Sequence, residues 1–138
     1  MGTPALVEAF YSRIWNDGNL TATRDLLTTG FCFRGSLGVE TQGIDAFENY
    51  VRPLRSALMA YHCEILDCVA EGNKAFAKMR FSGVHVAPFR GFQPSGKPVQ
   101  WHGAALFEFE RDRIASLWVL GDLAGLDAVL QENSTAGV

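Results

Sequence analysis

The sequence predicts one α+β domain, in which helices pack against one face of a curved sheet and enclose an apolar pocket for a small organic molecule. Helical periodicity is confined to the first part of the chain and to a short C-terminal segment. The chain between Tyr61 and that segment reads as antiparallel strands joined by turns. The chain has 138 residues and contains no repeat or linker, so residues 1–138 are expected to share one core.

The first element is expected to be a helix over residues 4–17. Thr3 can cap its start, and Gly18 can end it in the left-handed conformation. Asn19 or Thr21 then caps a short second helix. The first helix buries one apolar stripe at three- and four-residue spacing, made of Leu6, Val7, Phe10, Tyr11, Ile14 and Trp15.

A short strand at residues 31–33 and a glycine-rich connection through Gly43 lead to a third helix, which begins near Asp45. Pro53 lies inside this helix and lacks a backbone N–H, so we expect a kink or a restart there. One face of the helix is apolar and consists of Phe47, Tyr50, Val51, Leu54 and Leu58.

Hairpin turns at residues 71–73 and 111–112 are expected to join the strands that follow. A last short helix comes after Asp122. The tail over residues 132–138 is small and polar, and we expect it to fray.

Two long strands show which face of the sheet is buried. Side chains alternate across a strand, and here the odd-numbered ones are apolar, which predicts that they face inward. This inner set consists of Ala75, Ala77, Met79, Phe81, Gly83, Val99, Trp101, Gly103, Ala105, Phe107 and Phe109. Gly103 and Ala105 lie between large aromatics, which predicts unfilled volume at the centre of the sheet. The alternative is a well-packed core in which aromatics from the helices fill that space.

Composition excludes several classes of partner. The net charge is -3 and no cluster of Lys or Arg is long, so nucleic acid is not expected as a partner. The apolar runs are too short for a membrane span, and the first residues lack the features of a secretory signal. We therefore expect a cytoplasmic protein that has no membrane contact.

The three cysteines, Cys32, Cys63 and Cys68, lack the paired spacing of a disulfide framework and fit reduced thiols. No grouping of Cys and His has the spacing of a zinc site. The sequence therefore predicts neither a metal nor a disulfide.

Several stretches, in a fixed order along nearly the whole chain, carry a family resemblance. They are WNDGN (15–19), GIDAF (43–47), FSGVH (81–85), GFQPSGK (91–97), Trp118 and Asp122. Together they resemble SnoaL-like polyketide cyclases, which are members of the nuclear transport factor 2-like superfamily. The resemblance implies a cone-shaped α+β barrel with a curved mixed or antiparallel sheet, N-terminal helices over its concave face, and a homodimer. It also implies acid/base cyclisation of aromatic polyketide esters without a metal or a cofactor.

The chain departs from the family pattern at the positions that carry the chemistry. Val119 stands three positions before Asp122, where the cyclases have their acid/base aspartate. The family's pocket histidine falls at Ala105 and a polar neighbour at Gly103. A valine transfers no proton, so that mechanism cannot run unchanged here. Ketosteroid isomerases are more remote members of the same superfamily and take their general base from the first strand. At that place this chain has only Cys32, Phe33 and Arg34.

Two residues are candidates for catalysis. His85 continues the inner parity and matches a family histidine; in an apolar pocket a neutral histidine can act as a base. The alternative is a hydrogen-bonded histidine at the pocket rim, and a bulge at Gly83 would reverse its direction. Asp122 also matches a family position, although a carboxylate directly before a helix is well placed to cap it.

The ligand-lining candidates come from the helices and the inner face of the sheet. They are Tyr11, Trp15, Tyr50, Met79, Phe81, Trp101 and Val119. Tyrosine hydroxyls can donate to a substrate carbonyl, or they can belong to core aromatics with a satisfied polar tip. His102 falls on the outer face, and the orientation of His62, Glu64 and Asp67 stays open because their strand does not alternate cleanly.

The outer face carries an apolar patch of Ala104, Leu106, Ile114, Trp118 and Leu120. Such a patch indicates an interface, so we expect a two-fold homodimer through the convex sheet face around Leu106, Trp118 and Leu120. The alternative is that the C-terminal helix covers the patch.

Three functions fit these observations. The first is a cofactor-free enzyme that cyclises, isomerises or hydrates a small apolar carbonyl compound (polyketide-, terpenoid- or steroid-like), with His85 moving the proton. The second is a non-catalytic small-molecule-binding module that has lost the family's acid/base residues. The third is a dimerisation module with a filled core.

Overall fold

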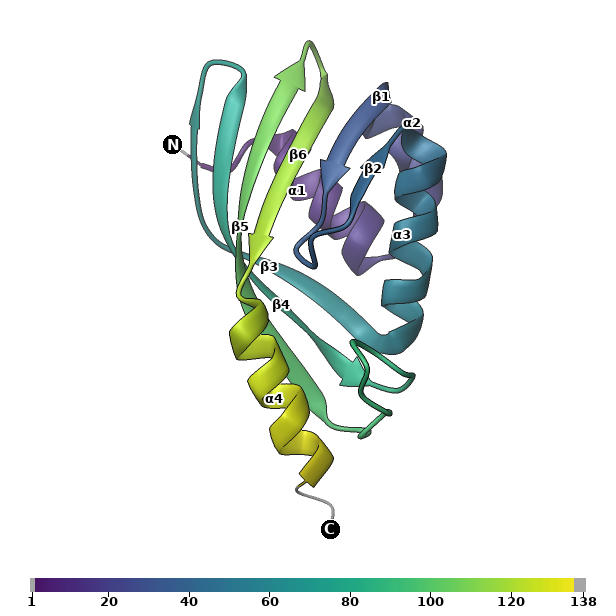
Figure 1. The fold of residues 1–138 in the computed structure, drawn as a ribbon. Coiled ribbons are helices and arrows are strands. Elements are labelled where there is room, and N and C mark those ends of the chain that lie inside the picture. The colour runs from purple at the N-terminus through teal and green to yellow at the C-terminus, as the bar shows by residue number, and fades with distance from the viewer. Residues whose placement is uncertain (1, 136–138) are drawn as a thin grey trace.

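One six-stranded sheet with helices on its concave side forms the fold of residues 2–135, which the computed structural model describes (Figure 1). The strands are β1 (Leu27–Arg34), β2 (Glu40–Gln42), β3 (Leu58–Glu71), β4 (Lys74–His85), β5 (Pro98–Glu110) and β6 (Arg113–Gly121). The helical segments are α1 (Ala5–Ala9), the π-helix η1 (Phe10–Asn16), the 3-10 helix η2 (Leu20–Ala22), α2 (Thr23–Leu26), α3 (Ile44–Ala57) and α4 (Leu123–Thr135). The predicted α+β class is confirmed.

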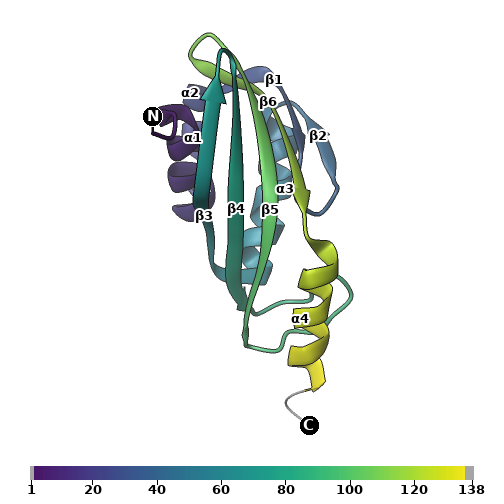
Figure 2. The same ribbon diagram turned by 90° about the vertical axis from the view of Figure 1, so that its left-hand side faces the viewer.

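The sheet is mixed and curved, with the strand order β2-β1-β6-β5-β4-β3. Only β1 and β6 run parallel; the other neighbours are antiparallel. Within residues 2–135 the two edge strands, β2 and β3, do not pair with each other, so the cone-like sheet stays open instead of closing into a barrel. In Figure 2, which looks onto the outer face, α1 and α3 lie behind the strands.

The predicted inner and outer faces of β4 and β5 are confirmed. Odd-numbered residues of β4 are buried along its whole length, and β4 pairs with β5 in unbroken register from Lys74 to Val84. No bulge therefore interrupts β4 at Gly83, and His85 keeps the inward direction. The hairpin turns between β3 and β4 and between β5 and β6 also lie where the sequence predicts them.

One side chain of the predicted outer patch points the other way. The register between β5 and β6 shifts beside Phe109, which pairs with Ile114, whereas Phe107 pairs with Leu117. This bulge turns Ile114 into the core, where it is fully buried, so its placement on the outer face is wrong.

The first helix has the predicted extent but a different start and type. Pro4 occupies the N-cap position and no side chain caps the helix, so the expected cap by Thr3 is wrong. After α1 the chain widens into the π-helix η1, and Gly18 follows with a φ of +69°. Asn19 caps η2, because its side chain accepts a hydrogen bond from the Thr21 N–H at 3.1 Å.

The end of η1 is clamped to the sheet and to α3. The Asn16 side chain accepts from the Cys63 N–H at 2.7 Å and donates to the Cys63 carbonyl at 3.1 Å. The Arg55 guanidinium donates to the Trp15 carbonyl at 2.8 Å, which satisfies an acceptor that the helix end leaves free. These contacts fix the position of the η1 side chains over the sheet.

Two further expectations concern helices. Of the kink or restart expected at Pro53, the restart is excluded, because α3 continues through Pro53 as one helix. The helix α4 continues to Thr135, so it includes residues 132–135 of the tail that is expected to fray, while residues 136–138 lie outside the described part of the chain. Asn133 anchors the last turn of α4 by donating to the Pro98 carbonyl at 3.1 Å.

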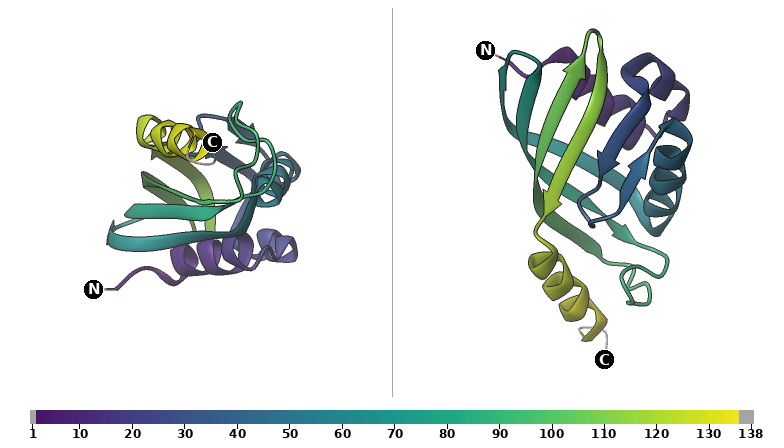
Figure 3. Two further views of the ribbon diagram at one scale, coloured as in Figure 1. Left: turned by 90° about the horizontal axis from the view of Figure 1, so that it is seen from below. Right: turned by 45° about the horizontal axis from the view of Figure 1, so that its top comes forward.

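The two ends of the sheet differ. The hairpin turns lie at one end, and α4 lies at the other together with the loop over residues 86–97 (Figure 1). The Arg90 side chain of this loop bonds the Asp127 carboxylate on α4 at 2.7 and 3.0 Å. Seen from below in Figure 3, strands separate α4 from α1 and η1. One continuous hydrophobic core joins these elements and supports the prediction of a single domain over residues 1–138.

Candidate functional site

A small cavity lies between η1, α3 and the concave face of the sheet. Its volume is about 20 Å³. That volume holds about one water molecule, whereas pockets for small organic ligands measure roughly 300–1,000 Å³. Its lining residues are Tyr11, Trp15, Phe33, Ser36, Tyr50, Leu54, Tyr61, Cys63, Phe81 and Val119.

The volume that the sequence left open above Gly103 is filled. A Cβ atom at Gly103 would lie 2.6 Å from Cε2 of Phe81, so the Phe81 ring occupies the space that the missing side chain leaves. The Phe81 ring in turn lies 5.4 Å from the Trp101 ring. The prediction of unfilled volume at Gly103 is therefore wrong, because the Phe81 side chain is long enough to reach into it.

Two of the lining residues carry buried hydroxyls that lack a partner. Within residues 2–135, neither the Tyr11 nor the Tyr50 hydroxyl makes a hydrogen bond. The Leu37 backbone N–H approaches Tyr50 without reaching hydrogen-bond geometry. Ser36 supplies a third polar group, whose hydroxyl accepts a long hydrogen bond of 3.4 Å from Trp101 Nε1. A buried hydroxyl without a partner is costly, so these groups favour an oxygen-bearing occupant.

The polar groups of the cavity are donors at neutral pH. Burial raises the pKa of Tyr50 to about 12, although the Leu37 amide and the Arg34 guanidinium act in the opposite direction. Burial also raises the pKa of Tyr11 well above its usual value, and nearby Cys63 adds to that effect. The same burial raises the pKa of the Cys63 thiol. Both tyrosines thus stay protonated, and the thiol does not supply a thiolate.

No curated protein matches the chain, but the profile of the SnoaL-like polyketide cyclases matches residues 5–130. The chain belongs to the SnoaL-like polyketide cyclase family. Solved structures share this fold. A proposed polyketide cyclase from Acidithiobacillus ferrooxidans has a TM-score of 0.83 at 20% identity, covering 96% of this chain and 99% of its own.

Two further similar structures come from Streptomyces. TsrD from Streptomyces laurentii has a TM-score of 0.80 at 28% identity, with 91% of each chain covered. IdmH from Streptomyces antibioticus, described as a proposed polyketide cyclase, has a TM-score of 0.80 at 17% identity, with 91% of this chain and 96% of its own covered. Identities this low establish the common fold and leave the chemistry to be argued from the residues.

In this SnoaL-like chain, the wall where the family resemblance places acid/base residues is apolar. Val119 lines the cavity, and its cross-strand partner is Ala105, which is fully buried on the same face. None of the lining residues in the described part of the chain is a carboxylate or a histidine. The cavity therefore offers hydrogen-bond donors without a proton acceptor.

His85 lies at the end of β4 and is buried, but it does not line the cavity. Its ring packs edge-on against Phe89, 6.1 Å between centroids, and its Nε2 atom has no hydrogen-bond partner. The backbone of His85 pairs with the end of the loop, through Lys97 and Gly96. Proton transfer by His85 stays a prediction, because His85 is not among the residues that line the cavity.

Asp122 occupies the start of α4 and caps it. Its carboxylate accepts from the Gly125 N–H at 3.0 Å, and its carbonyl accepts from the Leu126 N–H at 3.1 Å. The absence of a side chain at Gly125 gives the carboxylate room, because a Cβ there would collide with it. Asp122 thus makes the contacts of a helix cap, which is the structural alternative to a catalytic role.

Of the seven predicted ligand-lining residues, five line the cavity: Tyr11, Trp15, Tyr50, Phe81 and Val119. Met79 and Trp101 are buried on the same inner face outside the lining set. Sequence reasoning missed Phe33, Ser36, Leu54, Tyr61 and Cys63. Strand and helix periodicity could have found four of these, whereas Ser36 lies in an irregular turn that carries no periodic signal.

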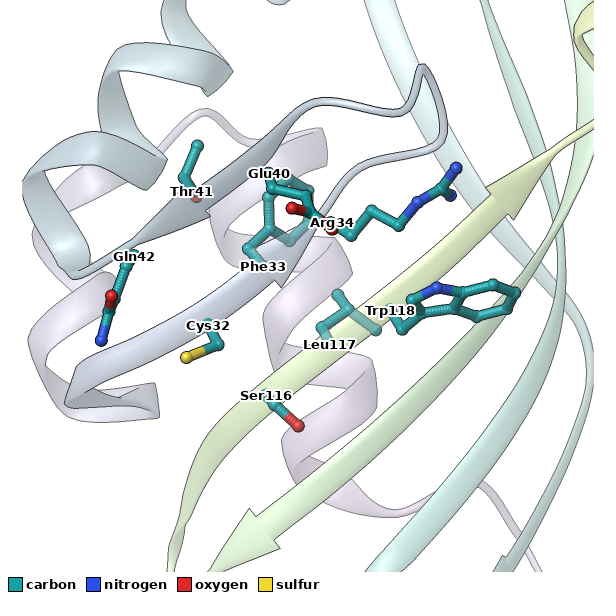
Figure 4. A pocket seen from close by; sticks show the side chains of 9 residues that line it. All are labelled: Cys32, Phe33, Arg34, Glu40, Thr41, Gln42, Ser116, Leu117 and Trp118. Atoms are coloured by element: carbon teal, nitrogen blue, oxygen red, sulfur yellow. The ribbon is translucent and has the colours of Figure 1, made fainter.

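The outer face carries an open groove of about 470 Å³ across β2, β1 and β6 (Figure 4). Arg34 lies at its margin, with the guanidinium carbon 5.4 Å from the centre of the Trp118 ring. Cys32, Ser116 and Gln42 line the groove as well. The groove is open and has both polar and apolar lining residues, and it lies on the opposite face of the sheet from the cavity.

An apolar row crosses the outer face beside this groove. Trp118 pairs with Leu106, Leu106 with Phe76, and Phe76 with Val69, so the four side chains lie side by side on neighbouring strands. The exposed fractions of Trp118 and Leu120 are 45% and 51%, so α4 does not cover them. The alternative in which the C-terminal helix hides the patch is therefore wrong.

His62, Glu64 and Asp67 are all exposed, which resolves their orientation. Glu64 pairs with Arg80 at 2.6 Å on the outside of the sheet. Among residues 2–135, no group of three or more His, Cys, Asp or Glu side chains could hold a metal ion. No helix within the same residues is long and apolar enough to cross a membrane.

Proposed function

We propose that this SnoaL-like protein binds a small, flat, apolar carbonyl compound, polyketide-, terpenoid- or steroid-like, between η1, α3 and the sheet. The observation that carries the proposal is the pair of buried hydroxyls, Tyr11 and Tyr50, that have no partner on one apolar cavity. A carbonyl oxygen accepts two hydrogen bonds and would satisfy both donors. Trp15 and Phe81 supply aromatic walls that would pack on a flat ring system once the cavity has widened.

Binding is favoured over acid/base catalysis as the function. Two neutral tyrosine hydroxyls can stabilise the oxygen of an enol or enolate, as donors in an oxyanion hole do. Removing a proton from carbon also needs an acceptor, and the apolar pair of Val119 and Ala105 supplies none. An enzymatic function with His85 as the base is the second candidate, which requires His85 to reach the bound compound.

The experiment is a thermal melt of the purified protein against a panel of aromatic polyketides, terpenoids and steroids. A ligand at about 100 times its Kd adds about 2.7 kcal/mol to the free energy of unfolding, which raises the Tm by several degrees in a domain of this size. A shift given by carbonyl compounds and not by their deoxy analogues would support the proposal. The absence of any shift across the panel would contradict it.

The outer face supports a homodimer. The row of Val69, Phe76, Leu106 and Trp118, flanked by Leu120, is a continuous apolar surface of the kind that marks an interface. A two-fold axis would place two such rows face to face, and each would cover the other.

Changing Trp118 to Glu is expected to convert the dimer to a monomer, because it removes the largest apolar side chain of the row and puts a charge in the interface. Sedimentation velocity measures the outcome directly. The matched control is Val86→Glu, an exposed apolar residue that directly follows β4, at the opposite end of that strand from Phe76. A Trp118→Glu protein that stays dimeric would place the interface elsewhere.

The three free cysteines, of which Cys32 is exposed, support the further proposal that the protein works in a reducing compartment such as the cytoplasm. The chemistry proposed above uses hydrogen bonds and apolar contacts alone, and needs neither a metal nor a cofactor.

A further inference from the structure

A cavity of about 20 Å³ has to open before it can receive a compound larger than water. Nine of its ten lining residues belong to helices or strands: Tyr11, Trp15, Phe33, Tyr50, Leu54, Tyr61, Cys63, Phe81 and Val119. Ser36 is the exception, because it lies in the turn that joins β1 to β2. Moving a helix or strand segment of the wall would break its backbone hydrogen bonds, whereas moving the turn over residues 35–39 would not.

The turn is internally bonded and only lightly attached to the cavity wall. The Gly35 N–H bonds the Val39 carbonyl and the Gly38 N–H bonds the Gly35 carbonyl, both at 2.9 Å and both within the turn. The side-chain hydrogen bond that joins the turn to the core is the long one from Trp101 to Ser36. The turn can therefore move as one unit while it keeps its own hydrogen bonds.

Glycines let the turn close tightly on the cavity. A Cβ atom at Gly35 would lie 2.5 Å from the Tyr50 hydroxyl oxygen, so this position brings the backbone directly against one of the unpartnered donors. A Cβ atom at Gly121 would lie 2.6 Å from the Ser36 carbonyl oxygen. The turn thus lies directly over Tyr50 at one end and against β6 at the other.

Arg34 connects the start of this turn to β6. It is the last residue of β1, and its pairing with Trp118 is the last in the parallel ladder. Its guanidinium donates to the Val119 carbonyl and lies over the Trp118 ring. Figure 4 shows the Arg34 side chain extending from β1 toward β6, beside Trp118. Because Val119 lines the cavity, this one bond ties the turn to the cavity wall.

We propose that the turn over residues 35–39 is the entrance to the cavity, and that Arg34 is the positioning residue that holds it shut. The identity of the compound that passes through this entrance rests on the proposed function, whereas the position of the entrance does not. The competing entrance is the loop over residues 86–97, which Arg90 fastens to Asp127 on α4. That loop contributes no residue to the cavity lining.

The test needs no ligand, because Cys63 lines the cavity and is buried. In a Cys32→Ser, Cys68→Ser background, Cys63 is the single remaining cysteine. Its rate of alkylation by iodoacetamide under native conditions reports how often the cavity opens. Urea unfolding gives the stability of each variant, and from it the part of the alkylation rate that comes from global unfolding. Subtracting that part leaves the alkylation rate that comes from local opening of the cavity.

Arg34→Met keeps an apolar stem over Trp118 and removes the donor. After the contribution of global unfolding is subtracted, this variant is expected to be alkylated at Cys63 at least about 10-fold faster. That factor corresponds to the loss of one hydrogen bond from a charged group. Ser36→Ala is a second variant, with a smaller acceleration in the same direction. Arg90→Met is the matched control and should stay within about 2-fold, because the loop that Arg90 fastens to α4 contributes no residue to the cavity lining.

Acceleration by Arg90→Met instead of Arg34→Met would move the entrance to the loop over residues 86–97 and overturn the proposal. Unchanged rates in both Arg34→Met and Ser36→Ala would overturn it as well. If the compound panel gives no thermal shift while Arg34→Met still speeds alkylation, the proposed ligand fails and the entrance stands. If the panel gives a thermal shift and Arg34→Met does not speed alkylation, the ligand stands and the entrance fails.

Discussion

Replacing both Tyr11 and Tyr50 with Phe is expected to weaken binding of the best carbonyl ligand about 100-fold, because each buried hydroxyl donates one hydrogen bond worth about 1.4 kcal/mol. The aromatic walls remain, so the residual affinity reports apolar contact alone. Isothermal titration calorimetry of the double variant and of each single variant measures the loss. Deoxy analogues of the ligand, which lack the oxygen, should bind the double variant and the native protein equally well.

The same double variant is expected to unfold at an equal or higher temperature without ligand. Removing two buried hydroxyls that have no partner relieves a desolvation cost, whereas removing bonded ones would create a loss. Asp122→Ala is the matched control with the opposite pattern: it removes a helix cap, so it should lower stability by about 1 kcal/mol and leave ligand affinity unchanged. A double variant that loses stability and keeps its affinity would refute the assignment of both hydroxyls.

Phe81→Ala is expected to cost about 3–5 kcal/mol of folding free energy, because it empties a buried aromatic site that cannot fully collapse. The ring of Phe81 both lines the cavity and covers Gly103. Its removal should therefore join the small cavity to the space above Gly103 and create room for a ring-sized compound. Urea unfolding measures the loss, and a thermal melt with indole or naphthol measures the rescue.

Phe107→Ala separates stability from cavity size. Phe107 is fully buried on the same face, packs against Phe10 and Tyr11, and does not line the cavity. Its truncation should destabilise the protein by a similar amount and should be rescued less by the same aromatic compounds. Equal rescue of both variants would show that the ligands bind any void in this core, and would remove the argument for a dedicated site.

The apolar wall of the cavity distinguishes this member of the family from the cyclases, which have acid/base groups there. The resemblance places an acid/base aspartate at Val119 and a histidine at Ala105, and these two positions are cross-strand partners on the inner face. Both groups are therefore replaced together, at one spot of the wall, by side chains that transfer no proton. What remains is a set of donors on helices, which suits holding an oxygen more than moving a hydrogen from carbon.

Local patterns determined the inner and outer faces of β4 and β5, the hairpin turns and the Asn19 cap. In each case the controlling interaction is within a few residues or follows the two-residue period of a strand. Five cavity residues followed from the same periodicities, because a helix stripe and a strand face point at a common core.

Tertiary structure alone decided the volume of the cavity, the direction of Ile114 and the part played by Ser36. The cavity is small because Phe81 reaches over Gly103, and that depends on how side chains from separate elements meet. Ile114 points inward because a register shift between β5 and β6 displaces it, and a two-residue period contains no information about such a shift. Ser36 reaches the cavity because Arg34, Gly35 and Gly121 bring an irregular turn against β6 and Tyr50, through contacts between residues far apart in the chain.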